Sequence, residues 1–211
     1  MRRIEYVWRR QSWLWFAMAS DSRFIPATEV PPSEFIASTA IVEADVIFGS
    51  GVKVWHHAQV RIGATIGDNV TIGKGSFIDE HVSIGERSKI QNGAQIYAPA
   101  VIGNGVFIGP LVVLTNDIYP RAVAPDGTLL GANDWTPVGC VVEEGAAIGA
   151  GAVIICTRIG SWALVGAGSV VTSPVEPHAL VVGNPARQIG WVCFCGLRLV
   201  GACSTCGWRT P

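Results

Sequence analysis

Six cysteines are present, and four of them lie close together near the end of the 211-residue chain. They form two pairs, Cys193 with Cys195 and Cys203 with Cys206, and a glycine follows each pair. Four thiolates at such spacing can present their sulfurs tetrahedrally, as structural zinc requires. The first pair has one intervening residue, which is fewer than usual for zinc knuckles. The pattern predicts a small zinc-ribbon-like segment over 191–211, with free thiols or a disulfide as the alternative.

A second group of polar and aromatic side chains lies in residues 115–138, a stretch that also contains several prolines and glycines. Loops of about two dozen residues are uncommon inside compact domains, and they are usually functional or disordered. We expect a loop that binds substrate, with an ordinary surface loop as the alternative. Its candidate binding residues are Asn116, Asp117, Tyr119, Arg121, Asp134 and Trp135.

A six-residue repeat must position both groups. Every sixth residue from Ile36 to Leu114 is apolar, without a miss, and a small residue stands two positions before most of them. This period fits neither an α-helix nor a plain strand, but it is the signature of a hexapeptide β-helix. Each hexad then forms one short strand and a turn, and three hexads close one triangular coil. A single coil buries little, so the fold depends on the stacking of successive coils.

The repeat also sets the predicted domain boundaries. It resumes at Val142 and slips by one residue between Ile154 and Ile159, so we expect one short turn there. The apolar run over 13–19 is too short to favour a cleaved signal peptide, and we expect a docked or disordered extension instead. The predicted parts are an N-terminal extension over 1–32, a β-helix domain over 33–190 with its loop, and the cysteine-rich segment over 191–211.

Composition narrows the classes of partner. The formal net charge is −1, which gives no electrostatic case for binding nucleic acid or an anionic membrane. No uninterrupted apolar run approaches the ~18 residues that a membrane helix needs. Although 49% of the residues are hydrophobic, they are spread at hexad spacing, as a solenoid interior requires.

Four features together resemble one enzyme family: the repeat itself, the loop motif TND-x-YPRA, the string GAGSVV and the tail LVVGNPARQIGW. The family is that of hexapeptide-repeat N-acetyltransferases acting on nucleotide-linked amino sugars, and the nearest branch acetylates UDP- or dTDP-linked 3-amino sugars. The resemblance covers about residues 36–195. It implies an all-β, left-handed parallel β-helix, which is an exception to the right-handed rule for parallel crossovers. It also implies a homotrimer with active sites between subunits, acetyl-CoA as the donor, and a role in cell-surface polysaccharide or glycoconjugate synthesis.

The resemblance places two candidate catalytic residues on one corner of the coil. Asn92, in the stretch KIQNGAQIY, matches an asparagine near the acceptor amine, and its carboxamide oxygen would hold an amine N–H; turn formation is the alternative. His56 matches a Trp-His pair of the family and precedes Asn92 by two coils, which predicts a separation of ~10 Å. This distance suits binding of one substrate better than a direct hydrogen bond. A histidine base and a proton transfer through the substrates themselves both stay open.

The same resemblance assigns binding residues. Arg121 would pair with a diphosphate or a sugar carboxylate, and Arg187 would meet the CoA phosphates. Gly93 departs from the family, which often has a second asparagine there. The expected substrate-binding residues are Gln91, Tyr97, Asn116, Asp117, Tyr119 and Arg121. The expected CoA-binding residues are Gly166, Ala167, Gly168, Ser169 and Arg187.

Two other functions remain as alternatives. A γ-class carbonic anhydrase has the same fold but needs three histidines brought together across a subunit interface, whereas His57 and His81 are spaced to lie on different faces. A non-catalytic solenoid scaffold is the other alternative, because a fold alone does not prove activity. Acetyl-CoA, nucleotide sugars and unpaired cysteines together imply the cytoplasm.

Overall fold

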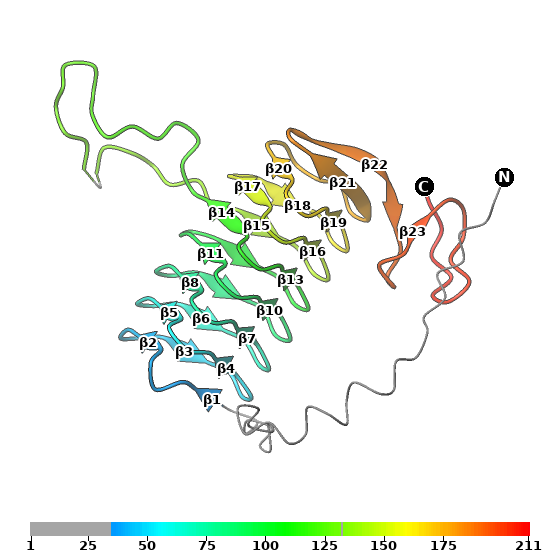
Figure 1. Ribbon diagram of the computed structural model, residues 1–211, viewed down its shortest axis with the longest axis horizontal. Helices are drawn as coiled ribbons and strands as arrows, with labels where there is room; N and C mark the ends of the chain where they lie inside the picture. Colours follow the sequence, from blue (N-terminus) through cyan, green and yellow to red (C-terminus); the bar gives the residue numbers. More distant parts are fainter. Residues whose placement is uncertain (1–34, 132) are drawn as a thin grey trace, which may run out of the picture. The chain divides into compact units, whose positions relative to one another are not determined.

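The computed structural model describes residues 35–131 and 133–211, and this part of the chain contains strands and turns but no helix. The extension predicted over 1–32 lies outside the described residues. Short strands, most of them two residues long, form three sheets whose strands stack coil upon coil (Figure 1). The prediction of an all-β parallel solenoid is confirmed, and its left-handedness stays a prediction.

Each sheet collects every third strand of the coil, so each forms one side of the solenoid. The ten-stranded sheet contains β1 (Phe35–Ile36), β4 (Lys53–Val54), β7 (Thr71–Ile72), β10 (Lys89–Ile90), β13 (Phe107–Ile108), β16 (Ala147–Ile148), β19 (Leu164–Val165), β21 (Ala179–Gly183), β22 (Ala186–Val192) and β23 (Arg198–Leu199). The seven-stranded sheet contains β2 (Ile41–Val42), β5 (Gln59–Val60), β8 (Phe77–Ile78), β11 (Gln95–Ile96), β14 (Val113–Thr115), β17 (Val153–Ile155) and β20 (Val170–Val171). The six-stranded sheet contains β3 (Ile47–Phe48), β6 (Thr65–Ile66), β9 (Ser83–Ile84), β12 (Val101–Ile102), β15 (Val141–Val142) and β18 (Arg158–Ile159).

Parallel pairing keeps equivalent residues of successive coils in line. In the ten-stranded sheet Ile90 pairs with Ile72 in the coil before it and with Ile108 in the coil after it. Backbone hydrogen bonds run between the coils, for example from the Gly73 N–H to the Ile90 carbonyl at 2.8 Å. The eighteen-residue period that the hexads predict is therefore the spacing of the ladder.

Branched apolar side chains fill the interior, because the second residue of each short strand points inward. Ile72, Ile90 and Ile108 are fully buried, and each such side chain contributes roughly 1.5–3 kcal/mol on burial. Serines occupy three of the small corner positions, and each hydroxyl has a hydrogen-bond partner; for example, Ser88 Oγ donates to the Gly103 carbonyl at 2.9 Å. In the first coil Ile36 is 52% exposed, since no other described coil covers that end of the stack.

Two turns shorten the coil. Val141 pairs with Arg158, one residue short of the regular period, which confirms the predicted slip. Leu164 pairs with Leu180, which is two residues short, and this second contraction was not predicted. The contracted span contains Pro174 and Pro177, which have no backbone N–H to donate.

The parallel stack ends at β21. β21 pairs with β22 in antiparallel fashion through the turn at Gly183–Ala186, and β22 pairs with β23 in the same way. The boundary predicted between residues 190 and 191 falls inside β22, so the cysteine-rich segment continues directly from the sheet.

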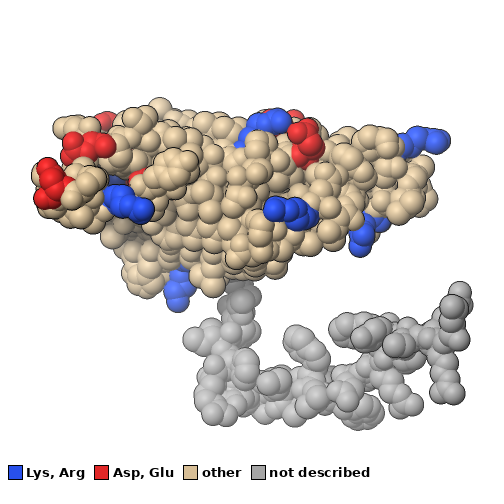
Figure 2. All heavy atoms as spheres, turned by 90° about the horizontal axis from the view of Figure 1, so that it is seen from above, with Lys and Arg blue, Asp and Glu red and all other residues tan. Residues whose placement is uncertain are grey.

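Charged side chains are sparse on the face shown in Figure 2, and uncharged residues cover most of it. Apolar side chains are exposed on the six-stranded sheet, where the paired neighbours Val101 and Val141 are 49% and 40% exposed. Within the described part of the chain, no helix is long and apolar enough to cross a bilayer.

Candidate active-site surfaces and a cysteine cluster

A groove of about 310 Å³ runs along the corner that follows the strands of the ten-stranded sheet. Trp55, Lys74 and Asn92 come from three successive coils and line it together with Gln91, as the repeat predicts. The coils are tied together here, because the Gly93 N–H donates to the Lys74 carbonyl at 2.9 Å. The predicted Asn92 and Gln91 therefore share one surface.

Asn92 has a structural role that its sequence position left open. Its Oδ1 accepts a hydrogen bond from the backbone N–H of Lys74 at 2.9 Å, and Asn104 does the same for Glu86 at 3.1 Å on another corner. Asn92 therefore ties its own corner to the coil before it. A catalytic role would use the second lone pair of this oxygen or the amide nitrogen. Gly73 makes the close approach possible, because a Cβ there would lie 2.6 Å from the Asn92 backbone nitrogen.

His56 lies on the same corner, with Lys74 between it and Asn92 along the stack: the Gly75 N–H donates to the His56 carbonyl at 3.0 Å. The ring is exposed, and its Nδ1 lies 2.8 Å from Thr39 Oγ1. The structure thus places His56 beside the groove and gives it a hydroxyl partner that sequence reasoning did not anticipate.

Tyr97 and Asn116 lie on the next corner, which follows the strands of the seven-stranded sheet. The Tyr97 ring packs on Phe77 with centroids 5.5 Å apart. Asn116 Nδ2 donates to the Ala98 carbonyl at 2.7 Å, which fixes the base of the long loop to the coil before it. The candidate substrate residues therefore fall into two groups on two corners of one chain.

The long loop, residues 116–140, leaves the stack between β14 and β15 (Figure 1). It forms an open pocket of about 570 Å³ that is lined by Asp117, Tyr119, Arg121 and Trp135, all of them candidate binding residues from the sequence. Asp117 closes a local turn, because its Oδ1 accepts the Tyr119 N–H at 2.8 Å. The tyrosine ring is left 83% exposed, where a flat ligand can stack on it.

The residues of the expected CoA surface differ in exposure. Ala167 and Gly168 are exposed and Gly166 is half-buried, so their backbone can meet a ligand. Ser169 is fully buried, and its Oγ accepts the Gly183 N–H at 3.2 Å. The hexad thus turns the Ser169 side chain into the core, and contact of its backbone with CoA stays a prediction.

Arg187 lies on β22 beside a small cavity of about 210 Å³ that also includes Glu176 and Gln188. Its side chain is exposed. Within the described residues its Nη1 donates a hydrogen bond to the neighbouring Ala186 carbonyl at 2.9 Å. A guanidinium so placed is free to meet phosphate oxygens.

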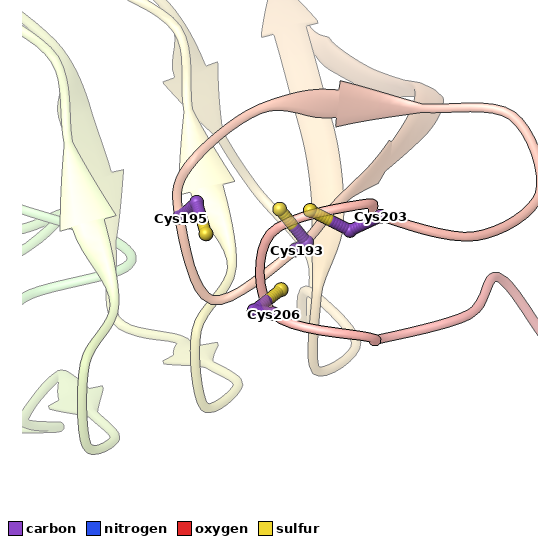
Figure 3. A group of neighbouring side chains, drawn as sticks. All are labelled: Cys193, Cys195, Cys203 and Cys206. Atoms are coloured by element: carbon purple, nitrogen blue, oxygen red, sulfur yellow. The ribbon is translucent and has the colours of Figure 1, made fainter.

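The four cysteines predicted as metal ligands lie together (Figure 3). The sulfurs of Cys193, Cys195, Cys203 and Cys206, here called the four-cysteine cluster, all lie within 4.8 Å of one another. Backbone N–H groups of Cys206 and Thr205 lower the pKa of Cys203 to about 6, whereas hydrogen bonding with Cys206 raises the pKa of Cys195 to about 12. Four thiols this close do not all ionise without a compensating cation.

Among the residues that the structure describes, no other group of histidine, cysteine or acidic side chains is arranged to hold a metal. His57 and His81 follow β4 and β8, which belong to different sheets, as their spacing predicted. A histidine metal centre is therefore not assembled within the described part of a single chain.

Sequence reasoning missed a polar column beneath the loop. Arg61 contacts Glu43 at 3.6 Å, Asp79 at 2.7 Å and Glu80 at 3.2 Å. Asp79 Oδ2 also accepts the Ala98 N–H at 3.1 Å, next to the carbonyl that holds Asn116. The sequence did contain a signal for this column, because residues 43, 61 and 79 are charged and each is one coil from the next.

With this geometry in place, comparisons with known proteins identify the repeat. Residues 81–116 match the bacterial transferase hexapeptide (six repeats), and residues 60–98 and 139–173 match the hexapeptide repeat of succinyl-transferase. The repeat that the sequence pattern predicted is thus a hexapeptide repeat of the kind that these two family models describe.

Two curated relatives match part of the chain. It is 52% identical over 60 residues to the dTDP-3-amino-3,6-dideoxy-alpha-D-galactopyranose 3-N-acetyltransferase of Aneurinibacillus thermoaerophilus, which is 28% of this chain and 31% of that protein. It is 40% identical over 85 residues to the serine acetyltransferase of Escherichia coli K12, or 39% of this chain and 30% of that protein. The matched regions therefore span under a third of these relatives.

Among solved structures, AntD, an N-acyltransferase from Bacillus cereus crystallised with dTDP and 3-hydroxybutyryl-CoA, is 18% identical with a TM-score of 0.49. That likeness covers 76% of this chain and 80% of AntD. PerB from Caulobacter crescentus, crystallised with CoA and GDP-perosamine, is 24% identical with a TM-score of 0.45, over 74% of this chain and 57% of PerB.

Proposed function

We propose that this protein is an N-acetyltransferase that moves an acetyl group from acetyl-CoA to the amino group of a UDP- or dTDP-linked amino sugar, with the amine at the 3-position. The observation that carries the proposal is the 52% identity over 60 residues with an enzyme whose name specifies this reaction on a dTDP-linked 3-amino sugar. The transferase hexapeptide repeats support the acyltransferase class more broadly.

The reaction is attack of a neutral amine on a thioester. The amine nitrogen forms a bond to the acetyl carbonyl carbon, the carbon–sulfur bond breaks, and the proton lost by nitrogen passes to the departing thiolate. Positioning the two reactants supplies much of the acceleration. In our proposal the side-chain amide of Asn92 holds the amine in the groove, and His56 at its edge binds substrate or accepts the proton.

Charge and shape suggest where the two substrates lie. The loop cavity offers the exposed Tyr119 ring for stacking with a base and the Arg121 guanidinium for a diphosphate. On the later coils, Ala167 and Gly168 present a smooth backbone surface for pantetheine, and Arg187 meets the CoA phosphates.

A homotrimer would join the two groups of candidate residues. The Asn92 groove and the loop cavity follow different sheets, so they open on different corners of one chain. Packing a second copy against this chain lets the loop of one subunit face the groove of the next. The exposed Val101 and Val141 pair offers apolar surface for such packing. We place this reaction in the cytoplasm, where both substrates would be available.

The similarity to serine acetyltransferase favours a second candidate, transfer of acetyl to the hydroxyl of serine. The first experiment is therefore release of the CoA thiol from acetyl-CoA with a panel of UDP- and dTDP-linked 2-, 3- and 4-amino sugars and free serine. Release with a 3-amino sugar alone supports the proposal, and release with serine alone replaces it. Silence across the panel from folded protein points to a non-catalytic scaffold.

Asn92 can be tested against a matched control. Both Asn92→Ala and Asn104→Ala remove an amide that holds the backbone N–H of the preceding coil. Only the first should lower kcat with the best acceptor, by about 10²-fold, as removal of one well-placed hydrogen-bonding group does. Equal activity of the two variants would reduce Asn92 to a turn residue.

A further inference from the structure

Residues 193–211, which follow β22, have too little apolar core to be held by packing alone. The strand within them, β23, has two residues, and Phe194, Leu197 and Val200 are 46%, 54% and 99% exposed. Segments this small are usually held by disulfides or a metal. The buried residues of this segment are Cys193 and Cys203, so the cysteines themselves form its centre.

The backbone shapes two matching turns around the cluster. In the first, the Gly196 N–H donates to the Cys193 carbonyl at 2.8 Å, and in the second the Gly207 N–H donates to the Cys203 carbonyl at 3.0 Å. Both glycines have positive φ, +75° and +73°. Each turn aims two sulfurs at a common point, whereas two disulfides would pair the sulfurs and give no reason for all four to converge.

We propose that the four-cysteine cluster binds one zinc ion through all four thiolates, and that the ion fastens residues 193–211 to the last coils of the solenoid. A tetrahedral site with zinc–sulfur bonds of about 2.3 Å has sulfurs roughly 3.8 Å apart, within the spread observed. Binding releases the remaining thiol protons. With four protein ligands the ion has no open position, so its role is structural.

Aromatic side chains connect the cluster to the solenoid. Phe194, which lies between the first two cysteines, packs edge-on against Trp162 at 4.9 Å and His178 at 4.8 Å between ring centroids. Trp208, two residues after the last cysteine, stacks on His178 at 4.4 Å. His178 in turn donates its backbone N–H to the Ser161 carbonyl at 2.9 Å. Each cysteine turn thus contributes one ring to a cluster that rests on the last coils.

The metal content of the full chain, purified under reducing conditions without chelator, tests the site. We expect about one zinc ion per chain, as one tetrathiolate site requires. Inductively coupled plasma mass spectrometry measures this ratio. Cys195→Ser changes an exposed ligand and should lose at least tenfold in zinc content without unfolding the solenoid. Cys203→Ser replaces a second ligand, which is buried, and should lose zinc in the same way. Cys156→Ser, outside the cluster, should keep the full zinc content.

Hydrogen exchange tests the second half of the proposal. Removing zinc with a chelator should speed amide exchange in residues 178–208, including the Val192 N–H that donates to the His178 carbonyl, and leave residues 60–108 unchanged. Zinc that persists in both ligand variants, iron in its place, or cysteines that are metal-free in the purified chain would overturn the site. Unchanged exchange after zinc removal would overturn the fastening role.

Discussion

Replacing Asp79 by asparagine keeps the size of the side chain but turns one acceptor oxygen into a donor. Asp79 Oδ1 accepts from Arg61 Nη1 at 2.7 Å and from the Glu80 N–H at 2.9 Å, and Oδ2 accepts the Ala98 N–H at 3.1 Å. All three partners are donors, so the new amide nitrogen must face at least one of them. That donor then loses its acceptor in a site where the Asp79 side chain is 11% exposed.

The expected cost follows from these contacts. A buried donor left without an acceptor costs about 1–3 kcal/mol. The weakened ion pair adds about 1 kcal/mol at most, because Arg61 is 34% exposed and solvent screens it. We expect the free energy of unfolding to fall by about 1–4 kcal/mol, and the Tm to fall by roughly 2–16 °C for a chain of this size.

Urea unfolding at one fixed protein concentration measures the change, and the fixed concentration keeps the comparison valid if the chain forms the proposed trimer. Glu80→Gln is the matched control: Glu80 also contacts Arg61, at 3.2 Å, but it is 46% exposed. That control should stay within about 0.5 kcal/mol of the parent chain. If Asp79→Asn unfolds at the same urea concentration as Glu80→Gln, the carboxylate does not hold the coils together and our reasoning is wrong.

Three further predictions concern the core, the groove and the slip. Ile90→Ala empties a fully buried position and should lower the free energy of unfolding by about 2–5 kcal/mol in thermal denaturation. Gly73→Ala puts a Cβ 2.6 Å from a backbone nitrogen and should cost about 1–3 kcal/mol, whereas Gly131→Ala, whose Cβ meets its nearest neighbour at 3.6 Å, should be tolerated. A hydrogen bond from Arg158 lowers the pKa of Glu143, so Glu143 stabilises the fold above its ordinary value of 4.5 and this stability is lost as the pH falls through the lowered pKa. Glu143→Gln should therefore unfold with less dependence on acid pH.

The strictness of the hexad explains why so much of the fold could be predicted. A side chain one residue out of register would leave the core, so Ile72, Ile90 and Ile108 fix the ladder by burial alone. The shortened turn near residue 156 was readable for the same reason. The change of direction between β21 and β22 was not, because the apolar run at 180–182 looks the same in a parallel and an antiparallel strand.

The candidate site was harder to predict because its details depend on contacts between distant positions. The partner of His56 is Thr39, one coil earlier and outside any motif. Ser169 looked accessible in a glycine-rich string, but its place in the hexad turns it inward. His178 and Trp208, thirty residues apart, meet only because the sheet folds back on itself after β21.

The reversal after β21 has a consequence for self-association. A stack of parallel strands ends in a row of unpaired N–H and C=O groups, which is a template on which another chain can add its own strand and start a fibre. Here the antiparallel hairpin of β21 and β22 occupies that row, and β23, two residues long, leaves little edge for further growth. Deletion of residues 179–211 should therefore expose the unpaired edge of β19 and cause the solenoid to aggregate.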